Sequence, residues 1–234
     1  MNETDAERVT IRVGETHAVS GLWARPAEAR ACLVLAHGAG AGMTHPSLEA
    51  IAADLFASGI ASLRYQFPFM EQGTKHPDPP PVAQAAVRAA VAEAARLAPD
   101  LALFAGGRSF GGRMTSQAQA ASPLPHVRGL VFLAFPLHPA KRPSDERGRH
   151  LFDVHIPMLF LQGTRDALAE PALLQPLCDE LGARATLKLL DGADHAFHVL
   201  ARSGRTDAEV RREAIEAITV WMERAITAAA VSSS

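Results

Sequence analysis

The sequence predicts an α/β fold, with one mostly parallel sheet of about eight strands and helices on both of its faces. Short, continuously apolar runs recur along the chain, as expected of strands that are covered on both faces. Helical segments lie between most of these runs, and such alternation builds a parallel sheet with right-handed crossovers. The composition, 48% hydrophobic and 21% charged over 234 residues, is typical of a globular protein, and we expect residues 1–234 to form a single domain.

The strands are expected in three groups. Residues 9–13 and 18–24 alternate loosely between apolar and polar side chains and predict an antiparallel pair at the start of the chain. Residues 31–36 are apolar throughout, which is typical of a buried parallel strand. Five further strands are expected at residues 60–64, 101–105, 130–135, 158–161 and 185–190.

Helices are expected between and after these strands, at residues 47–57, 80–97, 112–121, 170–181 and 206–227. The first two begin next to proline, which suits the first turn of a helix. In the last, charged side chains alternate with apolar ones at helical spacing. We expect residues 228–234 to fray, as chain ends commonly do.

Charge and hydropathy exclude several classes of partner. A formal net charge of −2 argues against binding nucleic acid through its phosphates, which needs a basic surface. No stretch approaches the roughly 18 apolar residues that cross a membrane, and the first eight residues are polar rather than typical of a signal peptide. Cys32 and Cys178 lie in apolar patterns and are expected to be buried thiols. We therefore expect a cytoplasmic protein that binds neither nucleic acid nor membrane.

Ser109 carries the strongest chemical signal. It lies between Gly107 and Gly111, directly after the expected strand 101–105 and before a helix. A serine on a strained strand-to-helix turn needs neighbours with almost no side chain, and these glycines supply them. The Gly-x-Ser-x-Gly motif alone also arises by chance, so its context decides whether Ser109 is read as a nucleophile.

A glycine-rich turn follows the strand 31–36. It reads His37-Gly38-Ala39-Gly40-Ala41-Gly42. We expect the N–H groups of Ala39 and Phe110 to form an oxyanion hole, because small residues let a substrate approach the backbone. His37 is expected to brace this turn through a ring hydrogen bond. A plain glycine-rich turn is the alternative, and a phosphate-binding loop is disfavoured because no Gly-Lys-Ser/Thr ending is present.

Two further reactive residues follow later strands. Asp166 comes after the strand 158–161, and His195 comes after the strand 185–190. The order Ser109, Asp166, His195 is that of a nucleophile, its orienting acid and its base on such a sheet. A serine hydroxyl needs an imidazole to remove its proton, and the imidazole needs a carboxylate to fix its tautomer.

Other residues compete for these roles. Asp191 and Asp194 are closer in sequence to His195, but neighbours on one loop rarely point their side chains together. Asp194 is expected instead to hold the loop. His198 is expected to pack or to form hydrogen bonds locally. Arg108 and Arg113 lie on either side of Ser109, in and just after the strand-to-helix turn from Gly107 to Gly111, the nucleophile elbow. These arginines either bind an acidic substrate group or pair with a carboxylate, and the same choice applies to Lys75.

Five segments together match a known pattern. They are Ala36-His37-Gly38-Ala39-Gly40, residues 64–71, residues 106–113 around Ser109, residues 160–166 and Asp194-His195-Ala196-Phe197. As a set they resemble the α/β-hydrolase superfamily over nearly the whole chain. Within it, the chain is similar to the small lidless members related to dienelactone hydrolases.

A narrower resemblance rests on residues 64–71 and 108–113. It is to the hydrolase-like group shared by a testis-expressed protein and a subunit of a histone-acetyltransferase complex. Dienelactone hydrolases carry cysteine at the elbow, whereas this chain has Ser109, so their substrate does not carry over. In the narrower group the resemblance also allows an interaction module without catalysis.

The residues predict a serine hydrolase of the carboxylesterase or thioesterase type that acts on small to medium acyl esters and needs no cofactor or metal. Residues 136–157 are too few for a full lipase lid. The expected pocket walls are Tyr65, Phe67, Phe69, Met70, Phe135 and Leu137. The alternatives are another reaction on the same residues, such as acyl transfer or peptide cleavage, and a non-catalytic interaction module.

Overall fold

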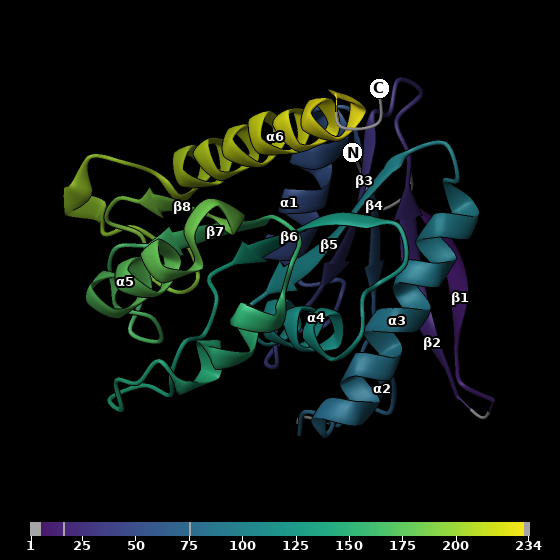
Figure 1. Cartoon of the computed structure of the whole chain (residues 1–234), viewed down its shortest axis with the longest axis horizontal. Coiled ribbons are helices and arrows are strands. Elements are labelled where there is room, and N and C mark those ends of the chain that lie inside the picture. Colours follow the sequence, from purple (N-terminus) through teal and green to yellow (C-terminus); the bar gives the residue numbers. More distant parts are fainter. Residues whose placement is uncertain (1–5, 16, 75, 232–234) are drawn as a thin grey trace.

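The computed structural model describes residues 6–15, 17–74 and 76–231, and in them the chain forms one eight-stranded sheet. The strand order is β1-β2-β4-β3-β5-β6-β7-β8 (Figure 1). Strand β1 runs antiparallel to β2 and β2 antiparallel to β4, whereas all other neighbours are parallel. The strands are β1 (Glu7–Val13), β2 (His17–Ala24), β3 (Ala31–Ala36), β4 (Ile60–Tyr65), β5 (Ala102–Arg108), β6 (Val127–Leu133), β7 (Met158–Gly163) and β8 (Ala185–Leu190). The expected mostly parallel sheet of eight strands is confirmed.

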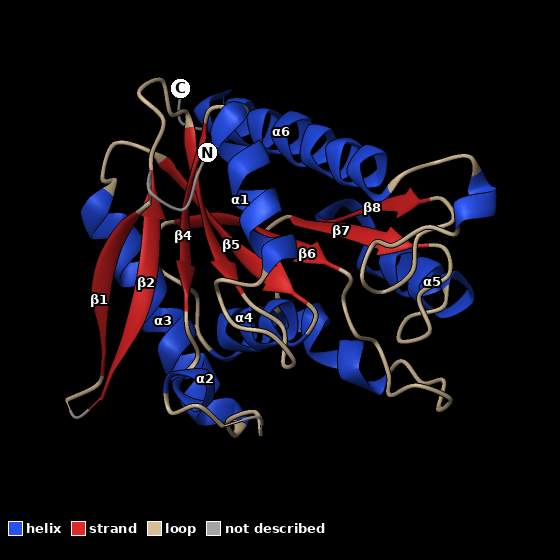
Figure 2. Ribbon diagram, turned by 180° about the vertical axis from the view of Figure 1, so that it is seen from behind, coloured by secondary structure: helices blue, strands red, loops and turns tan. Residues whose placement is uncertain are grey.

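Helices cover both faces of this sheet. The α-helices are α1 (Pro46–Ala57), α2 (Pro68–Glu71), α3 (Pro80–Leu97), α4 (Phe110–Ala121), α5 (Pro171–Leu181) and α6 (Asp207–Val231). Figure 1 shows α3, α4 and α5 in front of the sheet, and Figure 2, seen from behind, shows α1 and α6 on the other face. Short 3₁₀ segments, η2 (Glu146–Asp153), η3 (Gly182–Arg184) and η4 (Ala201–Ser203), lie in the connections.

The two faces of the sheet belong to two separate hydrophobic clusters, and β3 shows how one strand serves both. Leu33 and Leu35 are buried in the cluster that contains α1 and α6. Val34 and Ala36 are buried in the cluster that contains α3, α4 and α5. Because successive side chains of a strand point to opposite faces, a strand covered on both sides has to be apolar at every position.

Element boundaries differ from the sequence prediction at the strand ends. Strand β5 continues to Arg108, because Gly106 and Gly107 pair with β6 and β3 on either side. Strand β6 ends at Leu133 rather than at residue 135, because Ala134 has a φ of 58° and turns the chain away from the sheet. Periodicity alone does not reveal either change.

Shorter or terminal elements also differ. Neither α2 nor η2 was expected from the sequence, because α2 has only 4 residues and η2 is a 3₁₀ segment, which lacks the α-helical period. Helix α6 continues to Val231, and residues 232–234 lie outside the described part, so the expected fraying of residues 228–234 stays a prediction. Cys32 and Cys178 are buried free thiols, as expected. In the described residues no helix is both long and apolar enough to cross a membrane.

The approach of β5 to β6 leaves no room for a side chain at Gly106, which gives a test of the sheet. A Cβ atom at this position would lie 1.9 Å from the carbonyl oxygen of Val131. We expect Gly106→Ala to lower the free energy of unfolding by roughly 3 kcal/mol, since the neighbouring backbone has to move. Urea denaturation measures this.

Gly40→Ala is the matched control, because a Cβ atom at Gly40 meets nothing within 4 Å. Its free energy of unfolding should stay within about 0.5 kcal/mol of the wild type. Equal losses in the two variants would contradict the strand packing described above.

Candidate active site

The carboxyl ends of four parallel strands bring the candidate residues together at one edge of the sheet. The glycine turn follows β3, Ser109 follows β5, Asp166 follows β7 and His195 follows β8. Strands β3 and β5 are neighbours, as are β7 and β8, with β6 between the two pairs. Ligands collect at this edge in open α/β sheets. The topology therefore places residues that are far apart in sequence in one site.

Ser109 occupies a sharp turn between β5 and α4. Its backbone has a φ of 50° and a ψ of −116°, which is uncommon for a residue other than glycine. Its N–H donates to the carbonyl of Leu133 at 3.0 Å. Cβ atoms at Gly107 and Gly111 would lie 2.4 Å from the carbonyl oxygen of Ala36 and 2.5 Å from that of His37. The turn therefore needs glycine at both positions, as the motif predicts.

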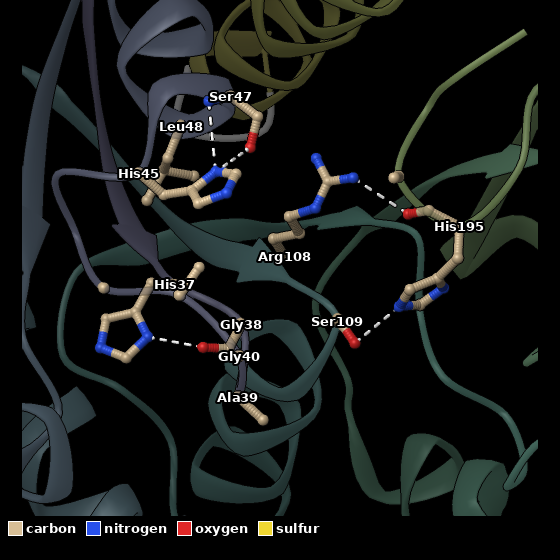
Figure 3. Close-up of a pocket in the computed structure, with 13 residues that line it drawn as sticks. His37, Gly38, Ala39, Gly40, His45, Ser47, Leu48, Arg108, Ser109 and His195 are labelled. Atoms are coloured by element: carbon tan, nitrogen blue, oxygen red, sulfur yellow. Dashed lines mark hydrogen bonds between the residues drawn. The ribbon is translucent and has the colours of Figure 1, made fainter. Parts of the chain in front are cut away.

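A chain of hydrogen bonds links Ser109 to a buried carboxylate. The Oγ atom of Ser109 lies 2.8 Å from Nε2 of His195, and Nδ1 of His195 lies 2.7 Å from Oδ2 of Asp166 (Figure 3 shows the first of these bonds). Asp166 is only 1% exposed. Its Oδ1 accepts the N–H of Leu168 at 2.8 Å, and its Oδ2 also accepts from Nε2 of Gln162. The carboxylate thus has three described hydrogen-bond partners, counting His195, so its burial is compensated.

The competing carboxylates and histidine have other partners. Oδ1 of Asp194 accepts the N–H groups of Ala196 and His198, so this side chain holds the loop, as expected. The Oδ1 atom of Asp191 lies 3.5 Å from the hydroxyl of Thr164. His198 is exposed, and its Nδ1 is paired with Asp207 at 2.5 Å. Of the three aspartates considered, only Asp166 contacts His195.

His37 fixes the glycine turn from below. Its Nδ1 lies 2.7 Å from the carbonyl oxygen of Gly38, and its Nε2 accepts the N–H of Phe67 at 2.9 Å. Since Nε2 accepts, the ring proton is on Nδ1, and Nδ1–H donates to Gly38. Burial lowers the pKa of His37 to about 4, while its bond to Gly38 acts in the opposite direction. The imidazole is therefore neutral at ordinary pH and serves as a structural brace.

Two backbone segments lie beside Ser109, the start of α4 and the glycine turn. Phe110 is the first residue of α4, and the first N–H groups of a helix have no carbonyl one turn earlier to bond. Gly38 lies close to the elbow, since a Cβ atom there would be 3.9 Å from Cβ of Ser109. The Gly38–Ala39 peptide is held by His37 on its carbonyl side. Because the peptide bond is trans, its N–H points in the direction opposite to that carbonyl.

A cavity of about 220 Å³ opens at Ser109 (Figure 3). Its walls are the glycine turn, the start of α1 and the loop that carries His195, with Arg108 beside Ser109. His45, Ser47 and Leu48 contribute to it although the sequence analysis missed them. The signal for them is their position, since they start the helix that directly follows the glycine turn.

The six residues expected to form pocket walls do not line this cavity. Tyr65, Phe67, Phe69, Phe135 and Leu137 are buried in the core, and Met70 is half-buried. Phe67 contacts the rings of His37 and Phe110 edge-on, so the aromatic side chains pack beneath the glycine turn and the elbow rather than above them. Position directly after a parallel strand places a residue at the sheet edge, but it does not specify to which side of the turn its side chain points.

The two elbow arginines differ in their surroundings. Arg108 lines the cavity and donates to the carbonyl oxygen of His195 at 3.0 Å. Burial lowers the pKa of Arg108, and the charges of Asp194 and Asp166 oppose that shift. Arg113 is half-buried on α4, and its Nε has no hydrogen-bond partner in the described part of the chain. Among described residues neither forms an ion pair, and Lys75 lies outside them.

The described residues contain no group of three or more histidine, cysteine or acidic side chains that could hold a metal ion.

Solved structures with this fold include several hydrolases. A dienelactone hydrolase from Anabaena variabilis is 22% identical, with a TM-score of 0.73 over 91% of this chain and 96% of that one. A serine hydrolase without a lid from Xanthomonas campestris is 20% identical, with a TM-score of 0.71 over 94% and 97%. An esterase domain from Rhodothermus marinus is 18% identical, with a TM-score of 0.69 over 94% and 98%. At these identities the likeness shows a shared fold.

The sequence itself matches a family described as the alpha/beta hydrolase domain, over residues 29–223. This match extends from the residues just before β3 into α6 and includes Ser109, Asp166 and His195. The chain belongs to the alpha/beta hydrolase family.

Proposed function

We propose that this chain is a serine hydrolase of the carboxylesterase or thioesterase type, which cleaves small to medium acyl esters through an acyl-enzyme at Ser109. The observation that carries the proposal is the unbroken path of hydrogen bonds from Ser109 through His195 to Asp166, with distances of 2.8 and 2.7 Å. These distances suit a nucleophile, a base and the group that orients the base.

In the proposed mechanism His195 takes the proton of Ser109 as Oγ attacks the ester carbonyl. Asp166 holds the Nδ1–H tautomer of His195 and stabilises the imidazolium that forms. His195 then gives the proton to the leaving alcohol or thiol. A water molecule, activated by the same imidazole, attacks the acyl-enzyme and releases the acid. All proton transfers take place at Nε2 of His195, which already faces Ser109.

The N–H groups of Ala39 and Phe110 are proposed to receive the negative oxygen of the tetrahedral intermediate. Both lie on backbone that is held in place before substrate arrives: Phe110 starts α4, and the carbonyl side of the Gly38–Ala39 peptide is fixed by His37. Donors that need no reorganisation stabilise a developing charge most effectively. Phe67 and Phe69 contact the rings of His37 and Phe110 and so support these two segments, and Tyr65 packs against Phe67.

The size of the site favours small or medium acyl groups. The cavity of about 220 Å³ at Ser109 is below the usual range for drug-sized ligands. Similarity of fold to a dienelactone hydrolase, a lidless serine hydrolase and an esterase domain supports ester chemistry.

The narrower resemblance, to the group of a testis-expressed protein and an acetyltransferase subunit, stays a prediction, as do a cytoplasmic location and a single domain.

The direct test is labelling by a fluorophosphonate probe together with hydrolysis of p-nitrophenyl butyrate. We expect the wild type to react with both, and Ser109→Ala to lose labelling and to lower kcat on the order of 10⁶-fold, because the nucleophile is gone. Failure of the folded wild type to label would overturn the proposal and favour an interaction module. Labelling with slow hydrolysis but rapid transfer to added alcohols or amines would indicate an acyltransferase.

Asp166→Asn tests the orienting role separately. The amide would donate to Nδ1 of His195 and place the ring proton on Nε2, facing Ser109, so kcat should fall about 10⁴-fold with little change in stability. Asp194→Asn is the control, since an amide oxygen can still accept the N–H groups of Ala196 and His198. Its kcat should stay within about 10-fold of the wild type. A larger loss of kcat in Asp194→Asn than in Asp166→Asn would show that Asp194, and not Asp166, orients His195.

The neutral brace at His37 predicts an acid-sensitive fold. Its pKa is about 4 in the folded protein, below that of an unfolded histidine, so only the unfolded chain gains this proton between about pH 6.5 and 4. Stability should therefore decrease as pH falls through this window. In His37→Gln the free energy of unfolding should change less steeply with pH, by up to about 1.4 kcal/mol per pH unit. Urea denaturation from pH 4 to 7 measures both slopes, and identical slopes would contradict the neutral, buried state of His37.

A further inference from the structure

Arg108 is a charged side chain in the wall of the candidate active site that lacks an ionic partner among the described residues. In Figure 3 its side chain extends from the elbow into the space between the start of α1 and the loop of His195. A guanidinium has five N–H donors, and the one described hydrogen bond of Arg108 uses a single nitrogen, Nη2, on the carbonyl oxygen of His195. Its other close contact is the ring of Phe197, 5.1 Å away.

The carboxylates nearest to Arg108 are already engaged elsewhere. Asp194 accepts two backbone N–H groups of its own loop. Asp166 accepts from His195, Leu168 and Gln162. Both act on Arg108 only through their charge, and neither forms an ion pair with it. A simple structural pairing of Arg108 with a neighbouring carboxylate, one of the two roles considered from sequence, is therefore not what the structure contains.

A second cavity adjoins the first, and Arg108 stands in the wall that they share. This cavity, of about 400 Å³, lies between the start of α1, Phe197 and the first turns of α6. His45, Ser47, Arg108 and Ala196 line both cavities. A substrate whose reacting carbonyl lies at Ser109 can therefore extend past Arg108 into the adjoining space.

The other charged side chains of the adjoining cavity have partners. Arg211 donates to Asp54 at 2.6 Å, and Asp207 is paired with His198 at 2.5 Å. Among the described residues, Arg108 is thus the charged group of this cavity without a counter-charge. Its partial burial makes a charge-assisted bond to an entering anion stronger than it would be in water.

We propose that Arg108 is the residue that determines specificity for a substrate bearing an anionic group, a carboxylate or phosphate some atoms away from the ester, and that this part of the substrate occupies the adjoining cavity. The planar guanidinium can bind such a group through two parallel N–H bonds. The inference rests on the proposed ester hydrolysis for its catalytic consequence, but the binding of the anion to Arg108 does not depend on turnover.

The first experiment compares matched ester pairs. One pair is the p-nitrophenyl half-ester of adipic acid and its methyl ester, which carries the anion on the acyl side. The other is 3-carboxyphenyl butyrate and its methyl ester, which carries it on the leaving group. We expect kcat/KM to favour the anionic member of at least one pair by roughly 10- to 100-fold. The pair that shows the preference identifies the side of the ester that enters the adjoining cavity.

Substitution then assigns the preference to Arg108. Arg108→Met keeps much of the side-chain volume and should abolish the preference, so that kcat/KM falls about 10-fold or more further for the anionic ester of the pair than for its neutral methyl ester. Arg108→Lys should retain part of the preference for the anionic ester, because lysine keeps the positive charge but lacks the two parallel N–H donors of the guanidinium. Arg113→Met, which removes the other elbow arginine, should leave the preference unchanged. Equal losses for neutral and anionic esters in Arg108→Met would show that Arg108 only braces the carbonyl of His195, and would overturn the proposal.

A binding measurement separates this proposal from the hydrolase proposal. Calorimetry with Ser109→Ala and monomethyl adipate or monomethyl phosphate as probes requires no catalysis. We expect one of the probes to bind, and Ser109→Ala/Arg108→Met to bind it at least 10-fold more weakly, while dimethyl adipate binds both variants equally. If the wild type hydrolyses none of the esters but the probe still binds and its binding depends on Arg108, the hydrolase proposal alone is rejected. Absence of any Arg108-dependent binding, with ester hydrolysis intact, would reject the anion site alone.

Discussion

The backbone conformation of Ser109 is the constraint on which the rest of the site depends. A residue with a φ of 50° turns the chain from β5 into α4 without a connecting loop, which leaves the hydroxyl at the edge of the sheet and the N–H of Phe110 beside it. Such a conformation costs on the order of 1–3 kcal/mol. It is held by the bond from its N–H to Leu133 and by the packing of Gly107 and Gly111 against the end of β3, where no Cβ atom fits.

The buried polar groups around this turn form a single supporting system. Asp166 is almost fully buried, and its charge is balanced by donors from a side-chain amide, a backbone N–H and His195. His37 is buried in the neutral form and uses both ring nitrogens on backbone groups. Arg108 differs from both, because its guanidinium keeps donors that no described acceptor uses. Buried groups that are fully bonded hold the site in shape, whereas a charge left open at a cavity is suited to a ligand.

The sequence predicted the sheet and the three residues brought together at its edge, because their signals are local. A continuous apolar run predicts a covered strand such as β3, and a residue directly after a parallel strand has to lie at the sheet edge. The side to which a side chain turns depends instead on packing. Phe67 was therefore wrongly expected in the cavity wall, although it supports His37 from the core. His45 was missed for the same reason, since its contribution to the cavity depends on where α1 docks.

Detection of the covalent intermediate tests the central claim most directly. The protein is mixed with p-nitrophenyl butyrate, quenched in acid within the first turnover and examined by intact-mass spectrometry and peptide mapping. If the elbow presents a nucleophile as described, the mass increases by one butyryl group, and the group is found on the peptide that contains Ser109. Turnover of the ester with no acylated protein, or with the acyl group on a different residue, would contradict the account.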